Sequence, residues 1–207
     1  MTTSSDPHGH HDWHGAEYVD DWIARDAERP ERAVLLRDVA ACLPFDPDAA
    51  VRVLDIGGGY GALTATVLER FPNGSVVLHD FSEPMLACAA GSLACFGDRV
   101  TFRTADLRDP RWTSSVGGSF DAVVSSDAIH NVREPAVIER VYHDVFDLVR
   151  REGWFVNLDL VFAVDRDETG APTAENQTRW LHDAGFQPVN AVPVDERRVR
   201  WEAFRAH

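Results

Sequence analysis

Three aspartates, each at the end of an expected strand, are the residues whose type and spacing most clearly indicate chemistry. Asp55 lies in the apolar stretch Val51–Ile56. Asp80 comes about twenty residues after a glycine-rich turn, where an acidic side chain can accept both hydroxyls of a ribose. The carboxylate of Asp106 can accept a hydrogen bond from an exocyclic amine such as adenine N6. Three carboxylates around one binding site favour an adenosine ligand with an ammonium or sulfonium charge over a pyrophosphate.

The turn that follows Asp55 has glycines at alternate positions, Gly57, Gly59 and Gly61. Glycine has no Cβ and tolerates positive φ, so this backbone can turn tightly and approach a ligand closely. The helix expected at Ala62–Arg70 would direct its first N–H groups toward that ligand. Strand, glycine turn and helix together predict a nucleotide-binding βαβ unit.

The elements that must position these residues alternate between strand and helix from Val51 onward. The expected strands are Val51–Ile56, Ser75–Asp80, Val100–Thr104, Phe120–Ser125, Trp154–Leu160, Val189–Val194 and Val199–Phe204. The expected helices between them are Ala62–Arg70, Glu83–Cys95, Pro135–Val149 and Thr173–Ala184. This pattern predicts an α/β protein with a Rossmann-like, seven-stranded, mostly parallel sheet, helices on both faces and an antiparallel strand pair at the edge. Ligands of such a sheet bind beyond the carboxyl ends of the strands.

The N-terminal part is expected to form a lid on this sheet. Two amphipathic helices, Asp12–Ala27 and Arg32–Leu43, are separated by Pro30. The polar, His-rich start of the chain is expected to be disordered, and metal binding by its histidines is left open. A chain of 207 residues suits one domain with a full core. The predicted boundaries are a tail at 1–11 and a single domain at 12–207, made of a helical cap at 12–50 and a cofactor-binding core at 51–207.

Composition and charge argue against several classes of partner. A net charge of −14, with every basic residue an Arg, argues against a nucleic-acid or anionic-membrane surface and excludes a phosphate-loop Lys. No apolar run approaches the ~18 residues that span a membrane, and the polar N-terminus is unlike a signal peptide. The three cysteines show neither metal nor disulfide spacing, which is typical of a reducing cytosol. We therefore expect a cytoplasmic protein that binds a small molecule.

Six segments, in this order, resemble the motifs of class I S-adenosylmethionine-dependent methyltransferases. VLDIGGGYG resembles the first motif, an acidic residue followed by alternating glycines, and HDFSEPML resembles the second. The other four are ADL at Ala105–Leu107, FDAVVSSDAIHNV at Phe120–Val132, LVRREGWFVNLDL at Leu148–Leu160 and LHDAGFQPV at Leu181–Val189. The resemblance covers the chain from about Val51 to its end. It implies S-adenosylmethionine as cofactor, S-adenosylhomocysteine as product and methyl transfer to a small-molecule acceptor.

The resemblance also implies which residues hold the cofactor. Its amino-acid end and ribose would contact Asp55, Gly57, Gly59, Gly61 and Asp80. Its adenine would contact Phe81, Met85, Asp106 and Leu107, and its sulfonium would lie beside Ser125 or Ser126. Family analogy places the N-terminal helix as a lid, with Tyr18 over the cofactor and Trp13 and His14 toward the acceptor.

The acceptor side is expected after the fourth and fifth strands. A general base is needed only if the nucleophile arrives protonated, and His130 is the leading candidate, with a structural role left open. Asp127 departs from the family pattern, where a small or apolar residue is more usual. It could neutralise a cationic substrate, bind a substrate hydroxyl or pair with His130. Asn131 and Asp159 are further candidates for substrate contact.

Two features of the resemblance bear on the acceptor. The segment Val161–Pro172 is short where many small-molecule methyltransferases carry a cap insertion, so the cap would come from the N-terminal helices, with or without a homodimer partner. An acidic metal cluster of the catechol-modifying type is absent from the sequence, so metal-independent methylation of O, N or C is expected.

Two alternatives stay open. One is a methyltransferase fold repurposed for a non-methylating or regulatory role. The other is an NAD-dependent oxidoreductase, because Gly57-x-Gly59-x-x-Ala62 also satisfies the dinucleotide fingerprint.

Overall fold

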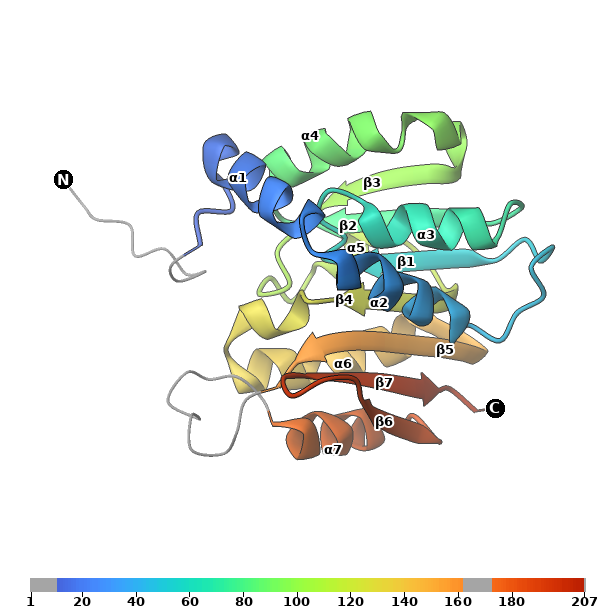
Figure 1. Cartoon of the computed structure of the whole chain (residues 1–207). Helices are drawn as coiled ribbons and strands as arrows, with labels where there is room; N and C mark the ends of the chain where they lie inside the picture. Colours follow the sequence, from blue (N-terminus) through green and yellow to red (C-terminus); the bar gives the residue numbers. More distant parts are fainter. Residues whose placement is uncertain (1–10, 162–172, 207) are drawn as a thin grey trace.

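A seven-stranded sheet forms the centre of the protein in the computed structural model, which describes residues 11–161 and 173–206 (Figure 1). The strands are β1 (Arg52–Ile56), β2 (Ser75–Asp80), β3 (Val100–Thr104), β4 (Phe120–Ser126), β5 (Val149–Leu160), β6 (Val189–Pro193) and β7 (Arg198–Phe204). Their order is β3-β2-β1-β4-β5-β7-β6. Neighbouring strands are parallel except for β7, which runs antiparallel to both β5 and β6. The predicted fold class is confirmed.

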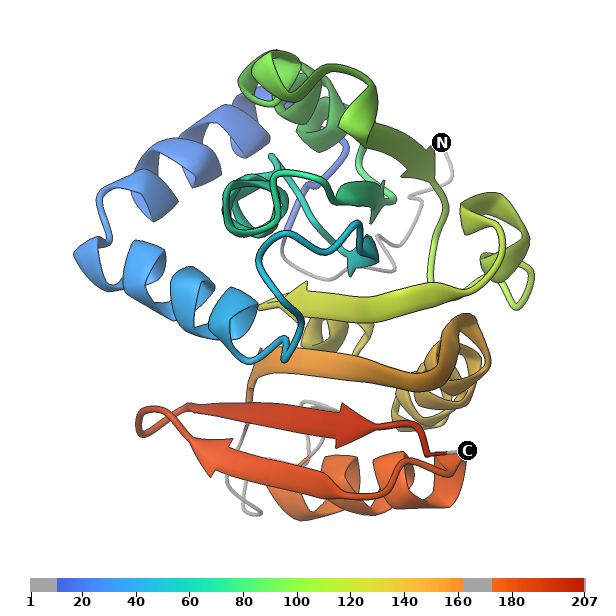
Figure 2. The ribbon, with the colours of Figure 1, turned by 90° about the vertical axis from the view of Figure 1, so that its right-hand side faces the viewer.

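Helices cover both faces of this sheet (Figure 2). They are α1 (Ala16–Ala27), α2 (Pro30–Ala41), α3 (Ala62–Arg70), α4 (Glu83–Ser92), α5 (Thr113–Val116), α6 (Pro135–Leu148) and α7 (Ala174–Ala184), with 3₁₀ turns η1 (Ala94–Arg99) and η2 (Ile129–Val132). Apolar residues of α2 and α3 form one core cluster with the sheet, and those of α5, α6 and α7 form another. Because both faces are covered, β4 is buried along its whole length, as is typical of a central parallel strand.

The order of the strands places a binding crevice at their carboxyl ends. From β1 the chain moves outward to β2 and β3, and then returns to place β4 on the other side of β1. The crossovers on either side of β1 therefore diverge, which opens a crevice between the ends of β1 and β4. Figure 1 shows α1 and the start of α2 beside this edge of the sheet.

Several predicted boundaries were wrong by a few residues. The second N-terminal helix begins at Pro30 rather than Arg32, because proline is well suited to the first turn of a helix. The helix predicted to reach Cys95 ends at Ser92 and continues as η1. Strand β5 begins at Val149 rather than Trp154. Its pairing with β4 is irregular before Trp154, where Glu152 has φ 61°, but the strand continues on both sides of this irregularity.

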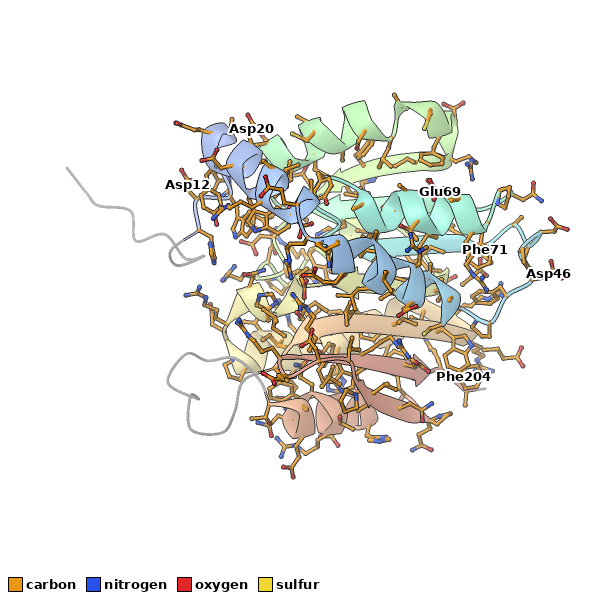
Figure 3. All side chains as sticks on the ribbon, in the orientation of Figure 1. Asp12, Asp20, Asp46, Glu69, Phe71 and Phe204 are labelled. Carbon is orange, nitrogen blue, oxygen red and sulfur yellow. The ribbon has the colours of Figure 1, made fainter. Side chains whose placement is uncertain are left out.

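The outer surface carries much of the negative charge. Asp12, Asp20, Asp46 and Glu69 are exposed and point outward in Figure 3. Within the described residues, no helix is long and apolar enough to cross a membrane. The predicted disordered tail, up to residue 10, and the segment 162–172 lie outside the described residues.

Candidate cofactor and acceptor site

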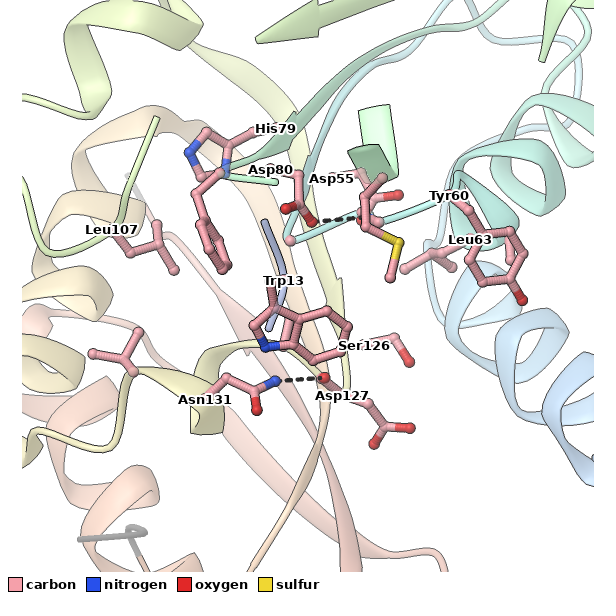
Figure 4. Close-up of a pocket in the computed structure, with 18 of the residues that line it drawn as sticks. Trp13, Asp55, Tyr60, Leu63, His79, Asp80, Leu107, Ser126, Asp127 and Asn131 are labelled. Carbon is pink, nitrogen blue, oxygen red and sulfur yellow. Dashed lines mark hydrogen bonds between the residues drawn. The ribbon is translucent and has the colours of Figure 1, made fainter. Parts of the chain in front are cut away.

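A pocket with about 870 Å³ of space, part of it open to solvent, lies at the carboxyl ends of β1, β2 and β4 (Figure 4). Twelve of the residues singled out from the sequence line it: Trp13, Asp55, Gly57, Gly59, Asp80, Phe81, Met85, Asp106, Leu107, Ser126, Asp127 and Asn131. The topology therefore brings the first, second and fourth strand motifs together with the start of the lid.

Six predicted site residues do not line this pocket: His14, Tyr18, Gly61, Ser125, His130 and Asp159. Ser125 is fully buried and its Oγ donates to the Ile56 carbonyl at 2.9 Å. Of the two serines predicted beside the sulfonium, only Ser126 lines the pocket. Gly61 caps α3 with φ 91° and packs against Leu93. Tyr18 hydrogen-bonds His11, and its ring packs edge-on against Trp13.

The carboxylate of Asp55 is buried in the pocket wall with one oxygen unsatisfied. Its Oδ2 accepts a hydrogen bond from Thr64 Oγ1 at 2.7 Å, while Oδ1 has no partner in the described part of the chain. Burial raises the pKa of Asp55 to about 7, with smaller contributions upward from Asp80 and downward from the Thr64 hydrogen bond and the charge of Arg32. Asp55 forms no ion pair within the described residues, and a buried carboxylate is stabilised by a positive partner.

Asp80 is the second buried carboxylate of the pocket. Its Oδ1 accepts from Ser82 N at 2.8 Å and its Oδ2 from Gly59 N at 2.9 Å. Burial raises the pKa of Asp80 to about 6 despite these backbone hydrogen bonds. The carboxylate is thereby fixed against the glycine turn and keeps lone pairs for a ligand.

The glycine turn requires its glycines. Gly57 and Gly59 have φ values of 65° and 54°, which favour residues without a Cβ. A Cβ on Gly57 would lie 2.4 Å from the Ala128 Cβ. A Cβ on Gly59 would approach Met85 Sδ at 3.7 Å, on the pocket side.

The loop after β3 forms the opposite end of the pocket. Leu107 is buried, and Asp106 Oδ1 accepts from Arg108 N at 2.8 Å. Phe81 is held edge-on by His14, with ring centroids 5.5 Å apart. His79 was missed from the sequence: its ring nitrogens are buried without partners in the described chain, and burial lowers its pKa to about 4, so it is neutral.

His130 and Asp159 form a tightly coupled pair beside the pocket. The His130 Nδ1 and Asp159 Oδ1 atoms are 2.5 Å apart, and the His130 backbone N–H donates to Asp159 Oδ2 at 3.0 Å. Burial lowers the pKa of His130, but the Asp159 carboxylate outweighs it, so the pKa is raised above its ordinary value. Asp159 therefore orients the ring and leaves Nε2 as the nitrogen available to a substrate.

Asp127 pairs with two arginines and not with His130. Its Oδ2 lies 3.1 Å from Arg32 Nη1, and its Oδ1 lies 3.1 Å from Arg198 Nε. Arg32 Nη1 also donates to Ser126 Oγ at 2.8 Å, and its Nε donates to Asp26 Oδ2 at 3.3 Å. Both Asp127 oxygens are thus occupied by guanidinium groups.

Arg32 and Asp26 are the main site residues that sequence reasoning missed. Tyr60 Oη donates to the same Asp26 Oδ2 at 2.8 Å, which joins α1, α2 and the glycine turn. Arg32 lies four residues before the buried Leu36, so it is on the core-facing side of α2. An arginine on the core-facing side of α2 could have indicated a buried ion pair, since buried arginines are nearly always paired.

In the ranges 11–161 and 173–206, no group of three or more His, Cys, Asp and Glu side chains is arranged to hold a metal ion. His8 and His10 of the N-terminal cluster lie outside these ranges.

Comparison with known proteins finds a methyltransferase domain in this chain. Residues 53–153 match the family "Methyltransferase domain". The chain is 27% identical over 190 residues to the lovastatin diketide synthase lovF of Aspergillus terreus, which covers 80% of this chain and 7% of that protein. It is 40% identical over 83 residues to a nocamycin O-methyltransferase of Saccharothrix syringae, covering 39% of this chain and 29% of that one.

Among solved structures, phosphoethanolamine N-methyltransferase 2 of Haemonchus contortus, in complex with S-adenosylmethionine, superimposes with a TM-score of 0.75 at 13% identity. That alignment covers 93% of this chain and 58% of the other. The shared fold is a Rossmann-like one. The methyltransferase-domain match over residues 53–153 and this fold are consistent with the class I S-adenosylmethionine-dependent methyltransferase family.

Proposed function

We propose that this protein transfers the methyl group of S-adenosylmethionine to a small-molecule acceptor. The observation that carries the proposal is the pair of buried carboxylates, Asp55 and Asp80, in one pocket, with Asp55 Oδ1 unsatisfied. Buried carboxylates are stabilised by a positive partner, and the amino-acid end of this cofactor brings an ammonium group. The residues present therefore fit the cofactor.

Other pocket residues would hold the remaining parts of the cofactor. Asp80 would accept the ribose hydroxyls, and Phe81 and Leu107 would offer apolar surfaces for the adenine, since all three line the pocket. Asp106 is the candidate acceptor for the adenine amine. The Arg32 guanidinium lines the same pocket, where it is already paired with Asp26 and Asp127.

In methyl transfer the main task of the protein is to align the acceptor with the methyl group. When bound, S-adenosylmethionine supplies a methyl carbon already activated by a positively charged sulfur. The lid and the glycine turn align the acceptor and exclude water. His130, oriented by Asp159, lies beside the pocket and is the candidate to take a proton through Nε2 if the acceptor arrives protonated.

Names of the relatives and charge support a small-molecule acceptor. The relatives include a nocamycin O-methyltransferase and polyketide synthases. This chain spans only 7% of the length of those synthases, so the acceptor is assigned here by class alone. The net charge of −14 disfavours nucleic acid and anionic membranes as partners. Three free cysteines favour the cytoplasm, and a homodimer remains the expectation if the lid needs a partner to close over the acceptor.

Calorimetric titration tests the cofactor assignment. We expect S-adenosylmethionine and S-adenosylhomocysteine to bind the wild-type protein, and Asp55→Asn and Asp80→Asn each to weaken binding at least tenfold. Asp98→Asn is the matched control, because Asp98 is exposed on η1. Binding of NAD in place of both methionine derivatives would overturn the proposal and favour an oxidoreductase.

A further inference from the structure

The indole nitrogen of Trp13 is a hydrogen-bond donor without a partner. Nε1 is buried in the pocket wall, and no acceptor contacts it in the described part of the chain. A buried tryptophan N–H usually finds a partner, and a donor left without one is destabilising. Figure 4 shows this nitrogen on the edge of the ring that faces Asn131.

The orientation of Trp13 is set by its surroundings. Its backbone carbonyl accepts from Ser82 Oγ at 2.5 Å, which ties the segment before α1 to the start of α4. Its ring packs edge-on against Tyr18 and Trp22, with centroids 5.4 and 5.5 Å away. These contacts hold the N–H toward the pocket, so we infer that a ligand accepts its hydrogen bond.

The charged groups on this side of the pocket are already paired with one another. Asp127 is bound by Arg32 and Arg198, each at 3.1 Å, and Asp159 is bound to His130. An ammonium acceptor would therefore meet carboxylates that are already neutralised. The groups that remain for the acceptor are the Trp13 N–H and the Asn131 amide in the pocket, and the His130 imidazole beside it. Asn131 Nδ2 donates to the Asp127 carbonyl at 3.4 Å and has a second hydrogen to donate, so these two N–H donors suit an oxygen atom.

We propose that Trp13 Nε1 and Asn131 bind a carbonyl oxygen of the acceptor, and that the methyl group goes to a hydroxyl or acidic carbon beside that carbonyl rather than to an amine. The inference rests on the proposed function. The proton of that hydroxyl or carbon passes to His130 Nε2, the electron pair left behind forms the bond to the methyl carbon, and the sulfur keeps the pair of the broken bond as a neutral thioether. Trp13 is in this proposal a specificity-determining residue.

A binding titration followed by ¹⁹F NMR of the protein tests the inference without measuring turnover. The protein is labelled with 5-fluorotryptophan and saturated with S-adenosylhomocysteine, and the ¹⁹F resonance of Trp13 is assigned from the Trp13→Phe variant. The probes are 2′-hydroxyacetophenone, with a hydroxyl beside a carbonyl, and 2-phenylethylamine, an ammonium of similar size. We expect the ketone to shift the Trp13 resonance, and the amine to bind at least tenfold more weakly.

Variants separate recognition from folding and from cofactor binding. Trp13→Phe keeps the ring but removes the N–H, and should weaken the ketone about fivefold with unchanged affinity for S-adenosylhomocysteine. Asn131→Ala should act in the same direction. Trp154→Phe is the control, since Trp154 packs on Phe204 with ring centroids 5.0 Å apart and does not line the pocket.

The outcomes are distinct. An unshifted Trp13 resonance, tighter binding of the amine, or a Trp13→Phe variant that loses S-adenosylhomocysteine but keeps the ketone would each overturn the inference. The last result would assign the N–H to the cofactor. Failure of S-adenosylhomocysteine to bind the wild-type protein would instead overturn the proposed function.

Discussion

At the scale of single residues, the pairing of His130 with Asp159 gives the imidazole a defined orientation. Asp159 is fully buried and accepts from both the ring and the backbone of His130, so ring orientation and tautomer are set together. The side chain of His130 keeps 15% of its surface exposed, which leaves its other nitrogen accessible. This arrangement favours a base over a purely structural histidine.

We expect His130→Gln and Asp159→Asn to lower kcat by about 10²-fold or more, while S-adenosylhomocysteine binds as in the wild type. Because the neutral imidazole is the active form and its pKa is raised, wild-type turnover should increase as pH rises through a value above 6.5. Steady-state kinetics against pH, with an acceptor of the hydroxyl-ketone class, measures both effects.

His182→Gln, an exposed change on α7, is the matched control. Equal turnover in His130→Gln and wild type would remove this residue from the mechanism.

At the scale of elements, the lid is joined to the sheet by an ion network centred on Arg32. The network connects Asp26 of α1, Arg32 of α2, Asp127 after β4 and Arg198 of β7. Asp26 and Arg32 are both largely buried, with 2% and 11% of their side-chain surfaces exposed. Because a buried charge without its partner is strongly destabilising, α1 and α2 can pack against the sheet only when these charges are paired.

Replacing Arg32 by Met should destabilise the protein by about 2–4 kcal/mol, since it leaves two buried carboxylates with one cationic partner fewer. Arg37→Met is the control, because Arg37 is exposed on the same helix and its replacement should change stability by less than about 0.5 kcal/mol. Urea unfolding gives both values. Equal stability of the two variants would mean that the network does not hold the lid.

The glycine turn is the second element that tolerates little change. Gly57→Ala should destabilise the fold and weaken cofactor binding, because its φ is 65° and the added Cβ would meet Ala128 at 2.4 Å. Gly91→Ala provides the contrast: Gly91 lies in α4, nothing is within 4 Å of an added Cβ, and alanine favours a helix by up to about 1 kcal/mol. Thermal unfolding of both variants tests the pair, and a stabilising Gly57→Ala would contradict it.

At the scale of the whole molecule, the buried carboxylates couple stability to pH and to the cofactor. Burial raises the pKa of Asp55 to about 7 and of Asp80 to about 6, against about 3.9 in an unfolded chain. Between those values the free folded protein holds protons that the unfolded chain has released. The contribution of these groups to stability is therefore lost as pH rises from about 4 to 7.

S-adenosylmethionine should restore part of that stability, because its ammonium group would pair with charged Asp55 and its ribose hydroxyls would donate to Asp80. We expect it to raise Tm by more at pH 7.5 than at pH 5.5, measured by calorimetry at one cofactor concentration. In Asp55→Asn this difference should shrink, because one of the two titrating groups is gone. A larger shift at the lower pH would contradict the ammonium assignment.

The amino-acid sequence by itself determined the architecture and the composition of the cofactor pocket. Strand periodicity, the alternating glycines and an acidic residue at each strand end are local patterns, and they predicted the sheet and the three aspartates that line one pocket. The resemblance to the methyltransferase motifs added most of the other predicted residues that line it. In a parallel sheet the carboxyl ends of the strands lie at the same edge, irrespective of the side chains.

Only the tertiary structure decided which charged groups pair. Asp127 had three open roles in the sequence, and its oxygens are taken by Arg32 and Arg198, which are 95 and 71 positions away along the chain. His130 pairs with Asp159 from another strand, and Trp13 reaches the pocket from the lid. Such pairings depend on how distant elements pack and which rotamers that packing allows, and no local pattern in the sequence records them.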